Sequence, residues 1–290
     1  MQTETLTSAP GLTQPYLKAA LAALPIPGGR AKDLPERELF LPGLTVDRSH
    51  LADYAKVCGF RMGETLPPTY LHILAFSMSM KLMTARDFPF PLLGMVHVAN
   101  RIETTRLVRA DEHFDVTVRA TNLRPHRQGR QLDLITEANV GDERVYTGTS
   151  TYLRKGSGKS ESAPSGPKTE IPEGSSAVWK LDDGLGRRYA AVSGDRNPIH
   201  LHTLSAKAFG FPRAIAHGMW TAARCLAALE GRLPEAMDYT VAFRKPVLLP
   251  GSVIFSTAET TTGWELGLRS PGKGGAKKDT PHLSGTITAR

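Results

Sequence analysis

The stretch of sequence that decides the fold is Tyr189-Ala190-Ala191-Val192-Ser193-Gly194, because it repeats an earlier segment. The earlier segment, about half a chain length upstream, reads Tyr54-Ala55-Lys56-Val57-Cys58-Gly59. Each copy is followed by an apolar stretch of helical length and then by several strand-like segments. One helix followed by antiparallel strands, occurring twice, predicts an α+β fold of two units, each with a sheet around its helix.

The two predicted units contain similar elements in the same order. After the first copy we predict a helix over Tyr70–Met83, and strands near 95–107, 113–122, 131–140 and 144–153. After the second copy, apolar residues recur at helical spacing from Met219 to Ala227. Strands are then predicted over 239–243 and near 252–260, 263–270 and 282–289.

A linker between the halves is predicted at residues 155–172, where small polar residues dominate and apolar periodicity is absent. This gives a first half over 1–154 and a second half over 173–290. The linker contains Gly158-Lys159-Ser160, but a phosphate-binding loop also needs a glycine at position 153, which is leucine. The phosphate-loop reading is therefore rejected.

Composition limits the classes of partner. The formal net charge is +8, but the basic residues are scattered and no nucleic-acid-binding motif accompanies them, so a small polyanion such as coenzyme A fits better. No apolar run is long enough to span a bilayer, so we expect no membrane partner. Two widely spaced cysteines, Cys58 and Cys225, are typical of a cytoplasmic protein.

The residues after Gly194 carry a chemical motif. Asp195 and His200 flank Asn197-Pro198, and proline disfavours helix at the residue before it, so a loop can bring the two side chains together. A carboxylate beside an imidazole forms an acid/base pair. Further on, His217-Gly218 stands where the helix is expected to begin, and a helix N-terminus suits a developing oxyanion.

In this region the sequence resembles the hydratase 2 motif of the MaoC-like dehydratase family, which has the hotdog fold. The match comprises Tyr189, Ser193-Gly194-Asp195, Asn197-Pro198-Ile199-His200, Gly210-Phe211 and Ile215-Ala216-His217-Gly218-Met219. Phe243-Arg244-Lys245-Pro246 and Pro250-Gly251 resemble the strand and turn that follow the central helix in this family. The first half resembles the family only in pattern, as in double-hotdog hydratases with one degenerate half.

The resemblance implies an (R)-specific enoyl-CoA hydratase or 3-hydroxyacyl-thioester dehydratase of fatty acid metabolism. Asp195 and His200 would activate one water molecule, and the backbone N–H of Gly218 would polarise the thioester carbonyl. The substrate would be an acyl-CoA or acyl-carrier-protein thioester, and no metal or redox cofactor would be needed. We also expect a homodimer. Phe60 stands where the first half would need an aspartate, so that half is expected to be non-catalytic.

Several residues keep two interpretations. Ser193 and Asn197 are candidates for substrate binding, although Asn197 more readily shapes the loop. His217 could contact substrate or act as a structural hydrogen-bonding residue at the helix start. Arg244 and Lys245 could bind coenzyme A phosphates or form a solvated strand end. His200-Leu201-His202 invites a metal site, but no further ligand cluster completes one.

Two other functions remain open at this point. Hotdog folds also host thioesterases, because a fold does not fix a function. A non-catalytic acyl-thioester-binding protein is the third possibility, and it would be preferred had the acid/base pair been missing from both halves.

Overall fold

The computed structural model describes residues 1–12, 31–156, 171–272 and 279–290. The chain forms two compact units that do not follow the sequence halves. The first unit comprises Met1–Val46, Leu71–Asn100 and Asp111–Pro167. The second comprises Asp47–Tyr70, Arg101–Ala110 and Lys168–Arg290, so the chain visits it twice before the linker.

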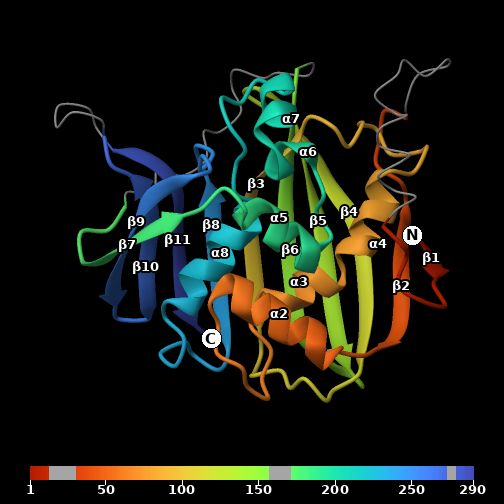
Figure 1. Cartoon of the computed structure of the whole chain (residues 1–290). Coiled ribbons are helices and arrows are strands. Elements are labelled where there is room, and N and C mark those ends of the chain that lie inside the picture. The colour runs from red at the N-terminus through yellow and green to blue at the C-terminus, as the bar shows by residue number, and fades with distance from the viewer. Residues whose placement is uncertain (13–30, 157–170, 273–278) are drawn as a thin grey trace. The chain divides into compact units, whose positions relative to one another are not determined.

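The first unit is an antiparallel sheet with helices on it. Its strands in spatial order are β1 (Gln2–Thr5), β2 (Arg37–Leu44), β4 (Phe114–His126), β5 (Gly129–Val140), β6 (Glu143–Lys155) and the start of β3 (Met95–Thr104). β2, β4, β5 and β6 pair antiparallel, whereas β1 pairs parallel to β2. Helices α3 (Tyr70–Leu74) and α4 (Phe76–Met83) follow one another, and α4 packs on β4 (Figure 1). Met78, Met80 and Met83 are buried, so they belong to the core of this unit.

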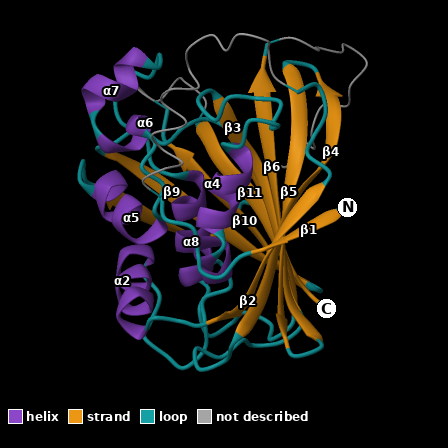
Figure 2. Ribbon diagram, turned by 90° about the vertical axis from the view of Figure 1, so that its right-hand side faces the viewer, coloured by secondary structure: helices purple, strands orange, loops and turns teal. Residues whose placement is uncertain are grey.

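The second unit has its own antiparallel sheet and most of the helices. Its strands in spatial order are β8 (Met237–Phe243), β11 (Thr280–Ala289), β10 (Gly263–Ser270), β9 (Gly251–Thr260) and β7 (Ser175–Leu181). Its helices are α2 (Arg48–Cys58), α5 (Leu185–Ser193), α6 (Pro198–Leu201), α7 (Thr203–Ala208) and α8 (Gly218–Ala227) (Figure 2). The alternation along β8 buries Tyr239 and Val241, and the Tyr239 hydroxyl donates to Ala222 O of α8 at 3.0 Å. This contact fixes α8 on the sheet.

The repeated segments form the C-terminal parts of α2 and α5. Both helices end at a glycine in the left-handed conformation, Gly59 with φ of 83° and Gly194 with φ of 73°. α2 packs against α5, and the rings of Tyr54 and Tyr189 lie 6.4 Å apart between centroids. The two copies of the repeat therefore lie together in the second unit, although one comes from the first half of the sequence.

The predicted α+β class and every predicted strand are confirmed, with ends shifted by a few residues. The single helix predicted over Tyr70–Met83 is instead two helices, interrupted at Ala75. Most of the predicted linker, including Gly158-Lys159-Ser160, lies outside the described residues. Within the described ranges, no helix has the length and apolar character needed to cross a bilayer.

Candidate active site

The loop that begins at Gly194 is ordered by its own short polar side chains. The hydroxyl oxygen of Ser193 accepts the N–H of Asp195 at 3.1 Å, and Oδ1 of Asp195 accepts the N–H of Asn197 at 3.1 Å. Oδ1 of Asn197 in turn caps α6 by accepting the N–H of Ile199 at 3.4 Å. Ser193 and Asn197 therefore hold the loop in shape, which leaves the Asp195 carboxylate partly exposed.

His200 lies on α6, and its side chain is buried. Nδ1 donates to the carbonyl oxygen of Ile215 at 2.8 Å, and because a carbonyl only accepts, Nε2 of the neutral ring carries a lone pair. Burial lowers the pKa of His200, although the Asp195 carboxylate opposes that shift. A neutral imidazole whose base nitrogen is set by a backbone hydrogen bond is suited to accept a proton.

The position of α6 depends on a close approach to α5. A Cβ added to Gly186 on α5 would lie 2.0 Å from the carbonyl oxygen of His200. Only glycine allows the two backbones to lie this close together. Gly186 was not singled out from the sequence, because its importance arises only from a contact between two helices.

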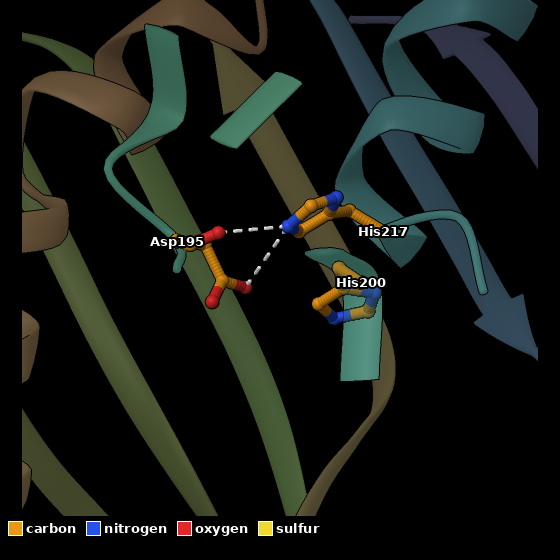
Figure 3. Close-up of side chains that lie close together, drawn as sticks. All are labelled: Asp195, His200 and His217. Carbon is orange, nitrogen blue, oxygen red and sulfur yellow. Dashed lines mark hydrogen bonds and ion pairs between the residues drawn. The ribbon is translucent and has the colours of Figure 1, made fainter. Parts of the chain in front are cut away.

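His217 joins the loop to the start of α8. Its Nε2 donates to the backbone oxygen of Asp195 at 2.9 Å and lies 3.9 Å from the Asp195 carboxylate (Figure 3). Burial and the neighbouring His200 lower the pKa of His217 to about 3, so this ring is neutral at ordinary pH. These contacts give His217 a structural role in holding Asp195 near the beginning of α8.

Asp195, His200 and His217 converge, since one polar atom from each lies within 4.8 Å of the other two. A carboxylate and two histidines can form a metal site. However, the two imidazole rings stack with centroids 3.7 Å apart and planes 25° apart, so their in-plane lone pairs do not point at one ion. In each ring, one nitrogen also donates a hydrogen bond to a backbone carbonyl oxygen. This donor set does not fit a metal ion.

The N-terminus of α8 begins at Gly218, directly after His217. N–H groups in the first turn of a helix precede its regular hydrogen-bond pattern and lie at the positive end of its dipole. A Cβ at Gly218 would lie only 3.2 Å from the ring of Phe243, so glycine fits the close packing here. The site thus combines a carboxylate and a buried imidazole with the N-terminus of a helix, whose N–H groups are suited to a negatively charged oxygen.

The structure brings together most of the residues predicted from the sequence, but not all of them. The structure gathers six of them around the loop between α5 and α6 and the start of α8: Ser193, Asp195, Asn197, His200, His217 and Gly218. Arg244 and Lys245 are exposed just after the end of β8, where their N–H groups donate to strand β11. The side chain of His282 also holds this segment, with Nδ1 donating to Lys245 O at 2.8 Å.

Comparison with known proteins gives the site a family. The family model described as a MaoC like domain matches residues 180–265, which include Asp195, His200 and Gly218. The 3-hydroxyacyl-thioester dehydratase X of Mycobacterium tuberculosis is 41% identical over 283 residues, covering 95% of this chain and 99% of that protein. A 3-hydroxybutyryl-CoA dehydratase of Methylorubrum extorquens is 43% identical over 63 residues, covering 20% of this chain and 40% of that one.

A solved structure agrees with these sequence matches. The crystal structure of HtdX of Mycobacterium tuberculosis superposes with a TM-score of 0.76 at 39% identity, covering 88% of this chain and 100% of that chain. The structure of Rv0216 of Mycobacterium tuberculosis, described as a double hotdog fold, superposes with a TM-score of 0.56 at 11% identity, covering 86% of this chain and 93% of that chain. These likenesses confirm the double-hotdog fold expected from the sequence. The extent and identity of these matches show that the chain belongs to the MaoC-like dehydratase family.

Proposed function

We propose that this chain is a hydro-lyase that interconverts trans-2-enoyl and (3R)-3-hydroxyacyl thioesters. The observation that carries the proposal is the placement of Asp195 and the neutral His200 beside the helix terminus that begins at Gly218. The names of the two curated relatives, both dehydratases of 3-hydroxyacyl thioesters, support the same reaction class.

In the hydration direction, one water molecule binds between the Asp195 carboxylate and Nε2 of His200. Nε2 takes a proton from this water as its oxygen bonds to C3 of the enoyl group, and the C2=C3 electron pair moves toward the thioester oxygen. The proton then passes to C2, which returns the acid/base pair to its starting state. Dehydration follows the same steps in reverse.

Charge develops on the thioester oxygen during this reaction. The N–H of Gly218 lies at the start of α8, where the helix dipole and an unpaired donor stabilise an oxyanion. Loss of one such donor in other enzymes typically costs about a hundredfold or more in kcat. Ser193, Asn197 and His217 fix the loop around the substrate through the hydrogen bonds described above.

A thioesterase is the alternative on the same fold, and one assay separates the two. Hydratase activity lowers the ultraviolet absorbance of an enoyl-CoA without releasing free thiol, whereas hydrolysis releases thiol. Chiral analysis of the product should give the (3R) alcohol. A binding protein without activity would do neither, so the same assay also tests that third possibility.

The thioester carrier and the assembly are finer parts of the proposal. Arg244 and Lys245 are exposed cations after β8, and we assign them to the phosphates of coenzyme A or of a carrier-protein arm. Charge reversal of both residues should raise KM for crotonyl-CoA and leave kcat nearly unchanged. We further propose that the chain is cytoplasmic and forms a homodimer. Light scattering of the purified chain, which measures its mass in solution, tests the dimer.

A further inference from the structure

His50 reaches the catalytic loop from the first half of the chain. It lies in the first turn of α2, where its N–H and that of Ser49 donate to Oδ1 of the N-cap residue Asp47. The cap fixes the start of the helix. The His50 ring is thereby directed at two groups that lie far away in the sequence, Tyr70 and the last turn of α5.

A short chain of hydrogen bonds runs through the His50 ring. Nε2 of His50 lies 2.8 Å from the carbonyl oxygen of Val192, and Nδ1 lies 2.7 Å from the hydroxyl of Tyr70. A carbonyl oxygen only accepts, so Nε2 is the donor and Nδ1 is the acceptor for the Tyr70 hydroxyl. Tyr70 is fully buried and burial raises the pKa of its phenol, which keeps this donor protonated.

The carbonyl that His50 holds is at a sensitive place. Val192 O belongs to the last turn of α5, whose final carbonyl groups have no partner within the helix. It lies two residues before the left-handed Gly194 and three before Asp195. Movement of this turn would therefore move the catalytic carboxylate directly.

A second hydrogen bond attaches the same helix to the other side of the site. Nε1 of Trp220, in the first turn of α8, donates to the carbonyl oxygen of Val57 in α2 at 3.0 Å. α2 is thus bonded both to the helix that ends before Asp195 and to the helix that begins at Gly218. We propose that His50 is a positioning residue that, through Val192, sets the distance from the acid/base pair to the oxyanion site; this rests on the proposed function.

Two substitutions separate the hydrogen bond to Val192 from the presence of a polar side chain. In His50→Gln the amide nitrogen reaches as far as Nε2 and can still donate to Val192 O. In His50→Asn the shorter amide reaches only the position of Nδ1, near Tyr70. We expect His50→Gln to keep kcat for crotonyl-CoA within about twofold, and His50→Asn to lower it about tenfold with KM unchanged, the cost of a slightly misplaced catalytic group.

Helix propensity differs between asparagine and glutamine by a few tenths of a kcal/mol. The same two substitutions at an exposed position of α2 are therefore needed as a control for this difference. Lys56→Gln and Lys56→Asn provide it, because Lys56 is exposed on the same helix. Unfolding midpoints of all four variants are measured beside their kinetics. Wild-type kcat in His50→Asn would overturn the inference, as would equal losses of kcat in both His50 variants.

The outcomes also distinguish this inference from the proposed function. If the wild-type chain does not hydrate crotonyl-CoA or any longer enoyl-CoA, the proposed function itself fails. If the wild type is active and only the rescue pattern at His50 is absent, the positioning role fails and the proposed function stands.

Discussion

The imidazole rings of His200 and His217 stack with their centroids 3.7 Å apart. Both rings are buried, and burial lowers the pKa of each, that of His217 to about 3. A positive charge on one ring would face the other ring without water to screen it. Burial is therefore the main reason that both pKa values are low, and the neighbouring His200 lowers that of His217 further. In the proposed mechanism, the lowered pKa of His200 supplies a neutral base.

The first prediction concerns the pH dependence of activity. Hydration needs neutral His200, whose pKa is below the usual 6.5, so kcat/KM should stay level from pH 8 down to about 6.5 and fall only below that. The measurement is a pH–rate profile for crotonyl-CoA. An acidic limb with its midpoint above pH 7 would contradict a buried, neutral base.

The second prediction concerns stability. Because the folded pKa of His217 is below its unfolded value, this residue binds a proton more readily in the unfolded chain, and its contribution to stability falls as the pH falls below about 6.5. In His217→Gln the amide can still bond Asp195 O but does not titrate. Between pH 7 and pH 5 the wild type should therefore lose up to about 2 kcal/mol more of its unfolding free energy than His217→Gln does. Urea unfolding at the two pH values checks this, and equal decreases would refute it.

The third prediction tests the acid/base pair. Asp195→Asn and His200→Gln should each lower kcat at least about a hundredfold, the usual scale for lost general acid/base assistance. Folding should survive in Asp195→Asn, because an asparagine Oδ1 can still accept the N–H of Asn197. Circular dichroism and unfolding midpoints serve as controls. Turnover near the wild-type rate in either variant would exclude the mechanism.

The fourth prediction tests the approach of α5 to α6. Gly186→Ala should displace His200, because the new Cβ would meet the His200 carbonyl oxygen at 2.0 Å, and kcat and stability should both fall. Gly184→Ala is the matched control, since its Cβ would meet mainly the mobile ends of long side chains such as Arg188. Equal kinetics for the two variants would show that α6 is not held by this contact.

The fifth prediction tests the division of labour between the two repeats. Cys58 occupies the place of Ser193 in the first repeat, and burial raises the pKa of its thiol to about 12, so it is no nucleophile. Cys58→Ser buries a hydroxyl and should destabilise the protein by about 1–3 kcal/mol. It should leave kcat within a few-fold. Abolished turnover in a stably folded Cys58→Ser protein would show that the first repeat takes part in the chemistry.

Local pattern predicted the strands and α8 well, because alternating and helical periodicity report directly which face of an element is buried. The break at Ala75 was missed, since the stretch over α3 and α4 is mainly apolar and no glycine or proline stands between the two helices. Strands β1, β2 and β7 and helices α2, α5, α6 and α7 were also not predicted. β7 is an edge strand whose central residues are mostly exposed, so its alternation is weak.

The site was predictable to the extent that it is continuous in sequence. Asp195 and Asn197 lie in the loop after α5, and His200 lies on the short helix α6 that Asn197 caps, so local turn chemistry brings the three together. The contributions of Gly186 and His50 were not predictable, because each depends on the approach of a second helix. The repeat of Tyr54 and Tyr189 was a usable signal for α2 and α5, but a repeat does not reveal that its two copies touch.

The membership of α2 in the second unit bears on whether the two halves of the chain can exist apart. A polypeptide that started after the linker would retain Asp195, His200 and Gly218 but would lack the helix that covers Tyr189. Val192 O and the Trp220 indole would lose their partners, and the apolar face of α5 would meet water. The second half of the sequence is therefore not self-sufficient, because the turn before Asp195 is supported by a helix that the first half encodes.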